Sequence, residues 1–192
     1  MLDRPFSFLI PIPSLIPSRV DNHIVRHLSD LNGQFLDEDS FTIMLENEDT
    51  ILYEVFEIQR PEVEGELLMG ISVIHPGKVG REFFMTKGHF HTIINTSEIY
   101  YSLSGEGFMV METSDGETAV EALSPGKVLY VPPGWAHRSV CTSRQQDLVT
   151  FFVYPGNAGH NYGTIEKKGF RKLVIESENG IEIINNPRYK EV

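Results

Sequence analysis

Two stretches of the 192-residue sequence decide which fold it predicts: KGHFHTIINTSEIYYSLSG at residues 87–105 and GKVLYVPPGWAHRSV at residues 126–140. Both combine short runs of β-branched and aromatic residues with glycine, proline or asparagine, as in strands joined by tight turns. The whole chain has six such runs: ILYEVFEI (51–58), LLMGISVIH (67–75), SEIYYSLSG (97–105), GFMVMET (107–113), KVLYVPP (127–133) and LVTFFVYP (148–155). Many short strands separated by turns predict an all-β fold, a sandwich or a jelly-roll barrel.

The remaining predicted elements are turns, one more hairpin and a short helix. The turn sequences are SDG at 114–116, PGK at 76–78 and PGK at 125–127. FRKLVIES and IEIINN, joined by ENG, predict a final hairpin over residues 170–186. A helix is predicted at residues 37–48, which begin with acidic residues and place Phe41, Met44 and Leu45 on one face.

Length and composition are those of a single domain over residues 1–192, with an N-terminal arm at 1–26 and a barrel core at 51–155. The formal net charge of −11 argues against nucleic-acid binding, which normally requires a basic surface. Cys141 is the only cysteine, so the chain cannot form an internal disulfide. These features predict a cytoplasmic protein.

The N-terminal arm is apolar but does not predict a membrane anchor. Residues 6–16 are mostly apolar, yet Pro11, Pro13 and Pro17 interrupt a helix there. The stretch is too short to span a bilayer, and no signal-peptide cleavage site follows it. We expect an extended arm that is buried against its own barrel or against a partner subunit.

The pair His89 and His91 is the first sign of a metal site. On a strand, residues i and i+2 face the same side about 6.5–7 Å apart, so two imidazoles can reach one ion. A turn at residues 95–97 predicts a hairpin that returns Glu98 to the same place. An isolated pair of this kind is more often incidental than metal-binding, and a lone histidine such as His137 is usually structural.

The combination of these groups resembles the cupins. GKVLYVPPGWAH matches the second cupin motif, G(x)5PxG(x)2H, at Gly126, Pro132, Gly134 and His137. The first motif departs from the general pattern, because six residues separate His91 from Glu98 where three or four are usual.

The longer spacing is similar to that of the cupin-type glucose-6-phosphate isomerases known mainly from archaea. FFMTKGHFH, EIYYSLSGEG, VLYVPPGWAHRSV and GHNYGTIEKKGFRKLVIE resemble that family, over a region from His27 to Arg188. The resemblance implies a single cupin jelly-roll barrel with one or two short helices. It also implies interconversion of glucose 6-phosphate and fructose 6-phosphate, a reaction of glycolysis and gluconeogenesis.

The resemblance further implies one divalent metal ion per subunit. Its implied ligands are His89, His91, Glu98 and His137. Three nitrogens and a carboxylate suit Fe²⁺, Mn²⁺, Ni²⁺, Co²⁺ or Zn²⁺ without ranking them, and Fe²⁺ is taken as the first candidate with the resemblance. Glu98 is implied both as ligand and as base, although a cation makes a carboxylate a weaker base. Tyr100 and His160 are further catalytic candidates, and a hydride shift is the competing mechanism.

Six positions are implied to bind the phosphosugar substrate. They are Tyr53, Ser72, Thr86, Gly88, Tyr154 and Tyr162. The alternative for each tyrosine is ordinary core packing. Lys87, Arg138 and Lys78 could add local positive charge.

Two other functions use the same ligand set and stay open at this point. One is a cupin metal-dependent dioxygenase, and the other is a cupin that binds a sugar phosphate without catalysis. A phosphate-binding set of hydroxyl groups favours the isomerase over an oxygenase of aromatic substrates. The family also implies a homodimer, with the N-terminal arm and an edge strand at the interface. No membrane partner is expected.

Overall fold

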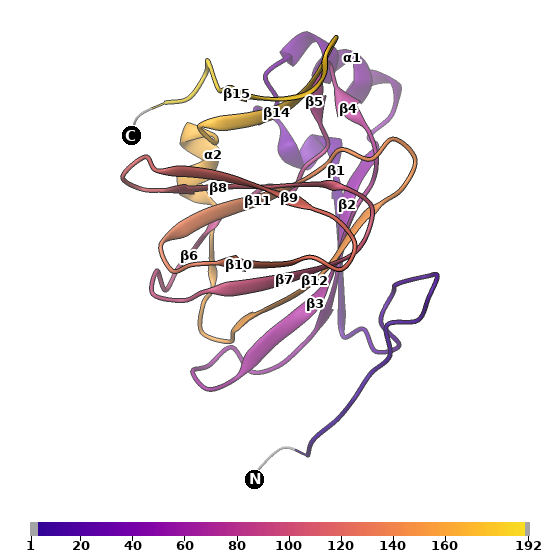
Figure 1. Ribbon diagram of the computed structural model, residues 1–192, viewed down its shortest axis with the longest axis vertical. Helices are drawn as coiled ribbons and strands as arrows, with labels where there is room; N and C mark the ends of the chain where they lie inside the picture. Colours follow the sequence, from indigo (N-terminus) through magenta and orange to yellow (C-terminus); the bar gives the residue numbers. More distant parts are fainter. Residues whose placement is uncertain (1–3, 191–192) are drawn as a thin grey trace.

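The structure is a computed structural model that describes residues 4–190. Residues 1–3 of the predicted arm, and the last two residues of the predicted 1–192 domain, lie outside the described residues. The described chain is mainly β-structure: a large sheet, a smaller sheet facing it and a third sheet beyond that one (Figure 1). The all-β prediction is confirmed.

The large sheet has six antiparallel strands in the order β1-β2-β3-β12-β7-β10. These are β1 (Asn22–His27), β2 (Ile51–Ile58), β3 (Leu67–Ile74), β12 (Leu148–Pro155), β7 (Glu98–Ser104) and β10 (Val128–Val131). Side chains alternate between the two faces of a strand. In β7, Tyr100 is buried, whereas Ile99 and Tyr101 are 45% and 40% exposed. One face of this sheet therefore covers the core, and the other faces outward.

A three-stranded sheet supplies the opposite wall of the core. Its strands are β11 (Trp135–Cys141), β8 (Gly107–Thr113) and β9 (Thr118–Leu123), in the order β11-β8-β9. The predicted SDG turn joins β8 to β9. Met109 and Val140 of this sheet belong to the same buried cluster as Leu52 and Phe152 of the large sheet. Two antiparallel sheets packed face to face in this way form the jelly roll that the sequence predicts.

Two smaller sheets flank the sandwich. The first contains β4 (Lys78–Val79), β5 (Glu82–Phe83), β14 (Lys172–Ser177) and β15 (Gly180–Asn185). The second contains β6 (Phe90–His91) and β13 (His160–Asn161). β14 and β15 pair from Lys172↔Asn185 to Ser177↔Gly180, which confirms the predicted final hairpin.

The helices are short and lie at the ends of the sandwich. They are the 3-10 helix η1 (Leu28–Leu31), α1 (Glu38–Asn47) and α2 (Gly163–Lys168). α1 matches the predicted helix, and Asp37 caps it by accepting a hydrogen bond from the Ser40 backbone amide at 2.9 Å. Within residues 4–190, no helix is both long and apolar enough to cross a membrane.

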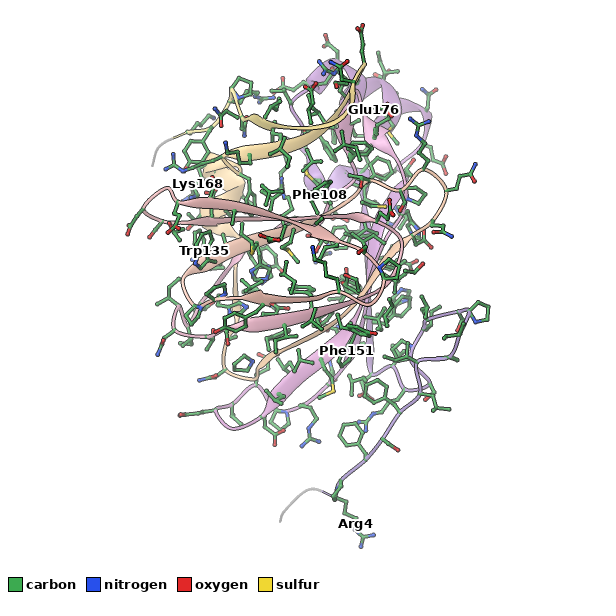
Figure 2. All side chains as sticks on the ribbon, viewed as in Figure 1. Arg4, Phe108, Trp135, Phe151, Lys168 and Glu176 are labelled. Carbon is green, nitrogen blue, oxygen red and sulfur yellow. The ribbon has the colours of Figure 1, made fainter. Side chains whose placement is uncertain are left out.

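The segment before β1 packs on the outer face of the large sheet. Ile10 and Leu15 contact the apolar cluster on that face. The ring of Phe8 lies 6.4 Å from that of Phe151, which Figure 2 shows on the side of the sheet where this segment runs. The irregular segment is shorter than the predicted arm at 1–26, because β1 already pairs with β2 at the edge of the sheet.

The connection between His91 and Glu98 is not the predicted hairpin. β6 pairs with β13, whereas β7 pairs with β10 and β12. Residues 92–97 form a loop in which the Thr96 amide donates to the Ile93 carbonyl at 3.1 Å. The hairpin prediction is wrong because the chain changes sheets here, from the small β6–β13 pair to the large sheet.

A buried carboxyl in β5 makes stability depend on pH. Glu82 is 3% exposed, and burial raises its pKa from 4.5 to about 6. Because the folded pKa lies above the unfolded one, wild-type stability should fall as pH rises from 4.5 through 6. Glu82→Gln removes this loss and can still accept the Leu36 amide hydrogen bond.

We therefore expect the free energy of unfolding of Glu82→Gln, relative to wild type, to rise by about 2 kcal/mol across this pH range. Urea unfolding at pH 4.5 and at about pH 7.5 measures it. Glu121→Gln, at an exposed position of β9, is the control and should follow wild type. A constant difference between Glu82→Gln and wild type at both pH values would contradict this account.

Candidate metal centre and active site

Four potential metal ligands converge between the two main sheets. His89 and His137 face each other in an isolated β-bridge, so the residue before β6 is held against β11. His91 ends β6, and Glu98 begins β7 in the large sheet. One ligand atom from each of these four residues lies within 4.8 Å of all the others. The sequence prediction that these residues come together is therefore met in the fold.

The distances fit a single ion. Glu98 Oε2 is 3.1 Å from His91 Nε2 and 2.9 Å from His137 Nε2. With metal–ligand bonds of about 2.1 Å, neighbouring ligands of an octahedral ion are about 3.0 Å apart and opposite ones about 4.2 Å. The cluster has this size, so a divalent cation fits at its centre.

The imidazoles present free nitrogen atoms to this centre. His91 Nδ1 lies 2.9 Å from Thr96 Oγ1 and 3.2 Å from the Thr96 carbonyl oxygen. These acceptors can hold the proton on Nδ1, so that Nε2 keeps its lone pair for a metal ion. The buried Nε2 atoms of His89 and His137 have no well-aligned hydrogen-bond partner, although that of His137 is close to Glu98. Buried nitrogens without partners are costly, and a metal ion would satisfy them.

The electrostatics favour the charge states that bind metal. Burial lowers the pKa of His89 well below its usual value, and the neighbouring His137 and His160 lower it further. Burial alone would raise the pKa of Glu98, but the charge interaction and close contact with His137 and the hydrogen bond with His91 lower it overall. His89 is therefore neutral and Glu98 ionised at neutral pH, as metal coordination requires.

A cavity opens beside the ligands and contains the other predicted site residues. Its lining includes His89, Glu98 and His137 but not His91. The predicted substrate-binding and catalytic residues on its wall are Tyr53, Ser72, Thr86, Gly88, Tyr100, Tyr154, His160 and Tyr162. The fold thus brings all of them to one place, from the large sheet, from the chain before β6 and from the segment around β13.

Aromatic side chains form the wall of the cavity around the ligands. The ring centroid of His160 is 4.3 Å from that of His89, 5.2 Å from Tyr154 and 5.8 Å from Tyr162. Burial, then the charge of Glu98 and a hydrogen bond with it, raise the pKa of Tyr100. Burial also raises the pKa of Tyr162 to about 12. These hydroxyls stay protonated at neutral pH and can donate hydrogen bonds to a ligand.

Polar groups gather around a glycine next to the metal ligands. Thr86 Oγ1 accepts a hydrogen bond from the Ser139 amide at 3.1 Å. The Tyr53 hydroxyl accepts a longer one from the Lys87 amide at 3.4 Å, so both hydroxyl protons remain available to the cavity. Gly88 has φ +75°, a left-handed conformation in which a side chain would be strained. Hydroxyl donors grouped in this way suit a phosphate group.

Only one of the three predicted cations faces this cavity. Lys87 lines it, forms an ion pair with Glu166 of α2 and lies over the ring of Tyr162. Lys78 pairs with Glu176 in the sheet of β4 and β14 and is not on the cavity wall. Arg138 is buried on the opposite face of β11, because it directly follows the inward-facing His137. The prediction of local charge from Lys78 and Arg138 is wrong for this reason.

Several residues on the cavity wall were not predicted from the sequence. Arg26 and Glu57 reach it from β1 and β2, and Ser139 reaches it from β11. Strand alternation could have identified Ser139, which lies two residues after His137. Nothing in the sequence marks Arg26, because β1 was expected to belong to the irregular arm.

The sandwich and its internal cluster of three histidines and one glutamate define a protein of the cupin type with a candidate metal site. A sequence profile described as glucose-6-phosphate isomerase (GPI) matches residues 25–190. The glucose-6-phosphate isomerase of Thermococcus kodakarensis is 48% identical over 88% of each chain. That of Thermococcus gammatolerans is 45% identical over 97% of each chain. The chain therefore belongs to the glucose-6-phosphate isomerase family.

Two similar solved structures each match about half of the chain. An oxalate oxidase in complex with glycolate has a TM-score of 0.43 at 14% identity and covers 52% of this chain and 47% of its own. A predicted oxalate decarboxylase from Thermotoga maritima has a TM-score of 0.41 at 22% identity and covers 54% and 79%. Similarity at this level assigns no activity to this chain.

Removing a ligand should remove the metal. His91→Ala and His137→Ala should each weaken binding of Co²⁺ more than about 100-fold, because each leaves three ligands and a gap. Isothermal titration with Co²⁺, together with metal analysis of the purified proteins, measures this. His23→Ala is the control, since His23 pairs with Glu54 on β2 and is not part of the cluster. Full metal content in either ligand variant would disprove the assigned centre.

Proposed function

We propose that this chain is a metal-dependent aldose–ketose isomerase that interconverts glucose 6-phosphate and fructose 6-phosphate. The main support is the family match over residues 25–190, which includes every residue of the cluster and of the predicted substrate pocket. The cavity adds a chemical reason, because it joins a metal-type ligand set to a group of hydroxyls beside a glycine.

The metal is one divalent ion per subunit, held by His89, His91, Glu98 and His137, with Fe²⁺ as first candidate. When bound, such an ion polarises the C1 and C2 oxygens of the open-chain sugar and stabilises negative charge that develops there. The four ligands reach the centre from β11 and from the chain around β6 and β7, which leaves the cavity side open to a substrate.

Glu98 is the proposed base, with Tyr100 and His160 beside it. The low pKa of Glu98 makes it a weak base in its resting position, so proton transfer requires that it loosen from its partners. Tyr100 interacts with the Glu98 carboxylate and can donate a hydrogen bond to it as its charge changes. Burial lowers the pKa of His160, so its neutral imidazole can accept or donate a hydrogen bond at a substrate hydroxyl.

The phosphate is proposed to lie beside Thr86 and Gly88. Thr86 can donate its hydroxyl proton, and Gly88 lies close to it in sequence and also lines the cavity. Tyr53, Ser72, Tyr154 and Tyr162 contribute further hydroxyl groups on the cavity wall. An enzyme with this activity acts in glycolysis and gluconeogenesis, and we place it in the cytoplasm.

The activity can be tested directly. Metal-free protein reloaded with Fe²⁺, Mn²⁺, Ni²⁺, Co²⁺ or Zn²⁺ should convert fructose 6-phosphate to glucose 6-phosphate, and EDTA should abolish turnover. A coupled dehydrogenase detects the product. Absence of turnover with every metal would refute the isomerase and favour a dioxygenase or a non-catalytic sugar-phosphate-binding cupin, which oxygen uptake and ligand titration would separate.

The same assay in D₂O distinguishes the two mechanisms. A base such as Glu98 exchanges the transferred hydrogen with solvent, so deuterium appears at C2 of the product. Complete retention of the substrate hydrogen indicates a hydride shift and removes the base role from Glu98.

The proposal includes a homodimer. The outward face of β7 and β10 carries Ile99, Tyr101, Val128 and Tyr130, which are 45%, 40%, 63% and 57% exposed. An apolar patch on the edge strand β10 is a common place for a subunit contact. The N-terminal segment lies on the same outer face of the sheet, around Phe151.

Tyr130→Lys should convert the dimer to a monomer, because it places a charge in the centre of this patch. Sedimentation velocity at micromolar concentration measures the change. Ile181→Lys, on β15, is a control that introduces the same charge at a 46% exposed apolar position elsewhere. Wild-type protein that sediments as a monomer would remove the dimer from the proposal.

A further inference from the structure

The chain that carries the first two histidines contains a β-bulge. Met85 bridges to Val140, and His89 bridges to His137. Three residues, 86–88, therefore face only two residues of β11 between these bridges. Gly88, at φ +75°, is the residue whose conformation permits the extra length. The hydrogen bonds on both sides are regular, with Thr86 N to Ser139 O at 2.9 Å and His137 N to His89 O at 3.1 Å.

The bulge decides which side chains reach the cavity. Thr86 and His89 both line it, although they are three residues apart. On a regular strand, residues an odd number apart face opposite sides of the sheet. The extra residue reverses this, so that one continuous segment presents a hydroxyl for the substrate and an imidazole for the metal centre to the same cavity.

Arg138 lies directly under the bulge, on the face of β11 away from the cavity. Its Nη2 donates to the Lys87 carbonyl at 2.7 Å and also contacts the Gln34 side-chain oxygen. Its Nη1 lies 3.1 Å from Met85 Sδ, and the guanidinium group lies 4.8 Å from the centre of the Phe170 ring. These contacts fix the carbonyl that the bulge turns away from the ladder.

The position of Arg138 carries a cost that packing alone does not explain. It is 3% exposed, and its direct hydrogen-bond partners are neutral, although the Glu82 and Glu112 carboxylates attract it from farther away. A buried cation whose partners are neutral acceptors is destabilising unless it satisfies groups that would otherwise be unpaired. Here it satisfies the Lys87 carbonyl, which lies in the chain between Thr86, the proposed phosphate contact, and His89, a proposed metal ligand.

We propose that Arg138 is a positioning residue: it locks the Lys87–Gly88 bulge and thereby keeps Thr86 and His89 facing the same cavity. The expected changes in kcat and KM rest on the proposed function, whereas the expected changes in Co²⁺ binding do not. The planar guanidinium is required, because one nitrogen contacts both Lys87 and Gln34 while the other faces Met85. A side chain with one ammonium group cannot hold these three contacts in the same geometry.

Arg138→Met keeps the length of the side chain and removes its donors. We expect the visible spectrum of the Co²⁺-loaded protein to change, because the spectrum reports the geometry of the ligands, including His89. We also expect the Co²⁺ dissociation constant to rise by about 10-fold or more, as for other residues that orient ligands. With fructose 6-phosphate, kcat should fall and KM should rise, because both His89 at the metal centre and Thr86 at the proposed phosphate position are displaced.

Leu31→Ala is the control for lost stability. Leu31 is fully buried in η1 and belongs to neither the bulge nor the cavity, so this variant should lower Tm and keep the wild-type Co²⁺ spectrum and kinetic constants. If Arg138→Met does not fold, Arg138→Lys is compared instead, with the same expected directions and smaller changes.

The inference is overturned if Arg138→Met keeps the wild-type Co²⁺ spectrum and a kcat/KM within about twofold of wild type. Where Arg138→Met does not fold, the same criterion applies to Arg138→Lys. The spectrum is recorded without substrate. Wild-type protein that binds Co²⁺ but isomerises the sugar with none of the five metals therefore refutes the proposed function, while the spectral comparison still decides the role of Arg138.

Discussion

The buried Glu98 carboxylate is the constraint on which the site depends. It is 3% exposed and begins a strand of the large sheet, while its two closest imidazole partners, His91 and His137, belong to other sheets. An ionised carboxylate in the interior requires partners at hydrogen-bond distance. The two main sheets must therefore pack closely at this point, and the cavity opens beside the place where they do.

Much of the fold could be predicted because strand signals are local. The runs at 51–58, 107–113 and 148–155 coincide with β2, β8 and β12. Apolar and β-branched residues between turn formers mark them without knowledge of their partners. The ligand set could be proposed for a different reason: the spacing of His89, His91, Glu98 and His137 resembles a known family, and the fold does bring them together.

The features that escaped prediction depend on how segments pair. The hairpin expected before Glu98 failed because sequence does not say that the chain changes sheets there. Arg138 was expected to add charge to the pocket, but alternation along β11 turns it to the other face. The bulge at Gly88 is visible only when the residues between the bridges at Met85 and His89 are counted against β11.

The ion pair between Lys87 and Glu166 links the cavity to α2. A phosphate dianion beside Lys87 would compete with the Glu166 carboxylate for the same ammonium group, so substrate binding and the anchoring of this helix oppose each other energetically. Separation of the pair would then reduce the net binding free energy of the phosphosugar and speed the departure of product. For a reversible reaction between two sugars that carry the same phosphate, this antagonism would favour rapid exchange in both directions.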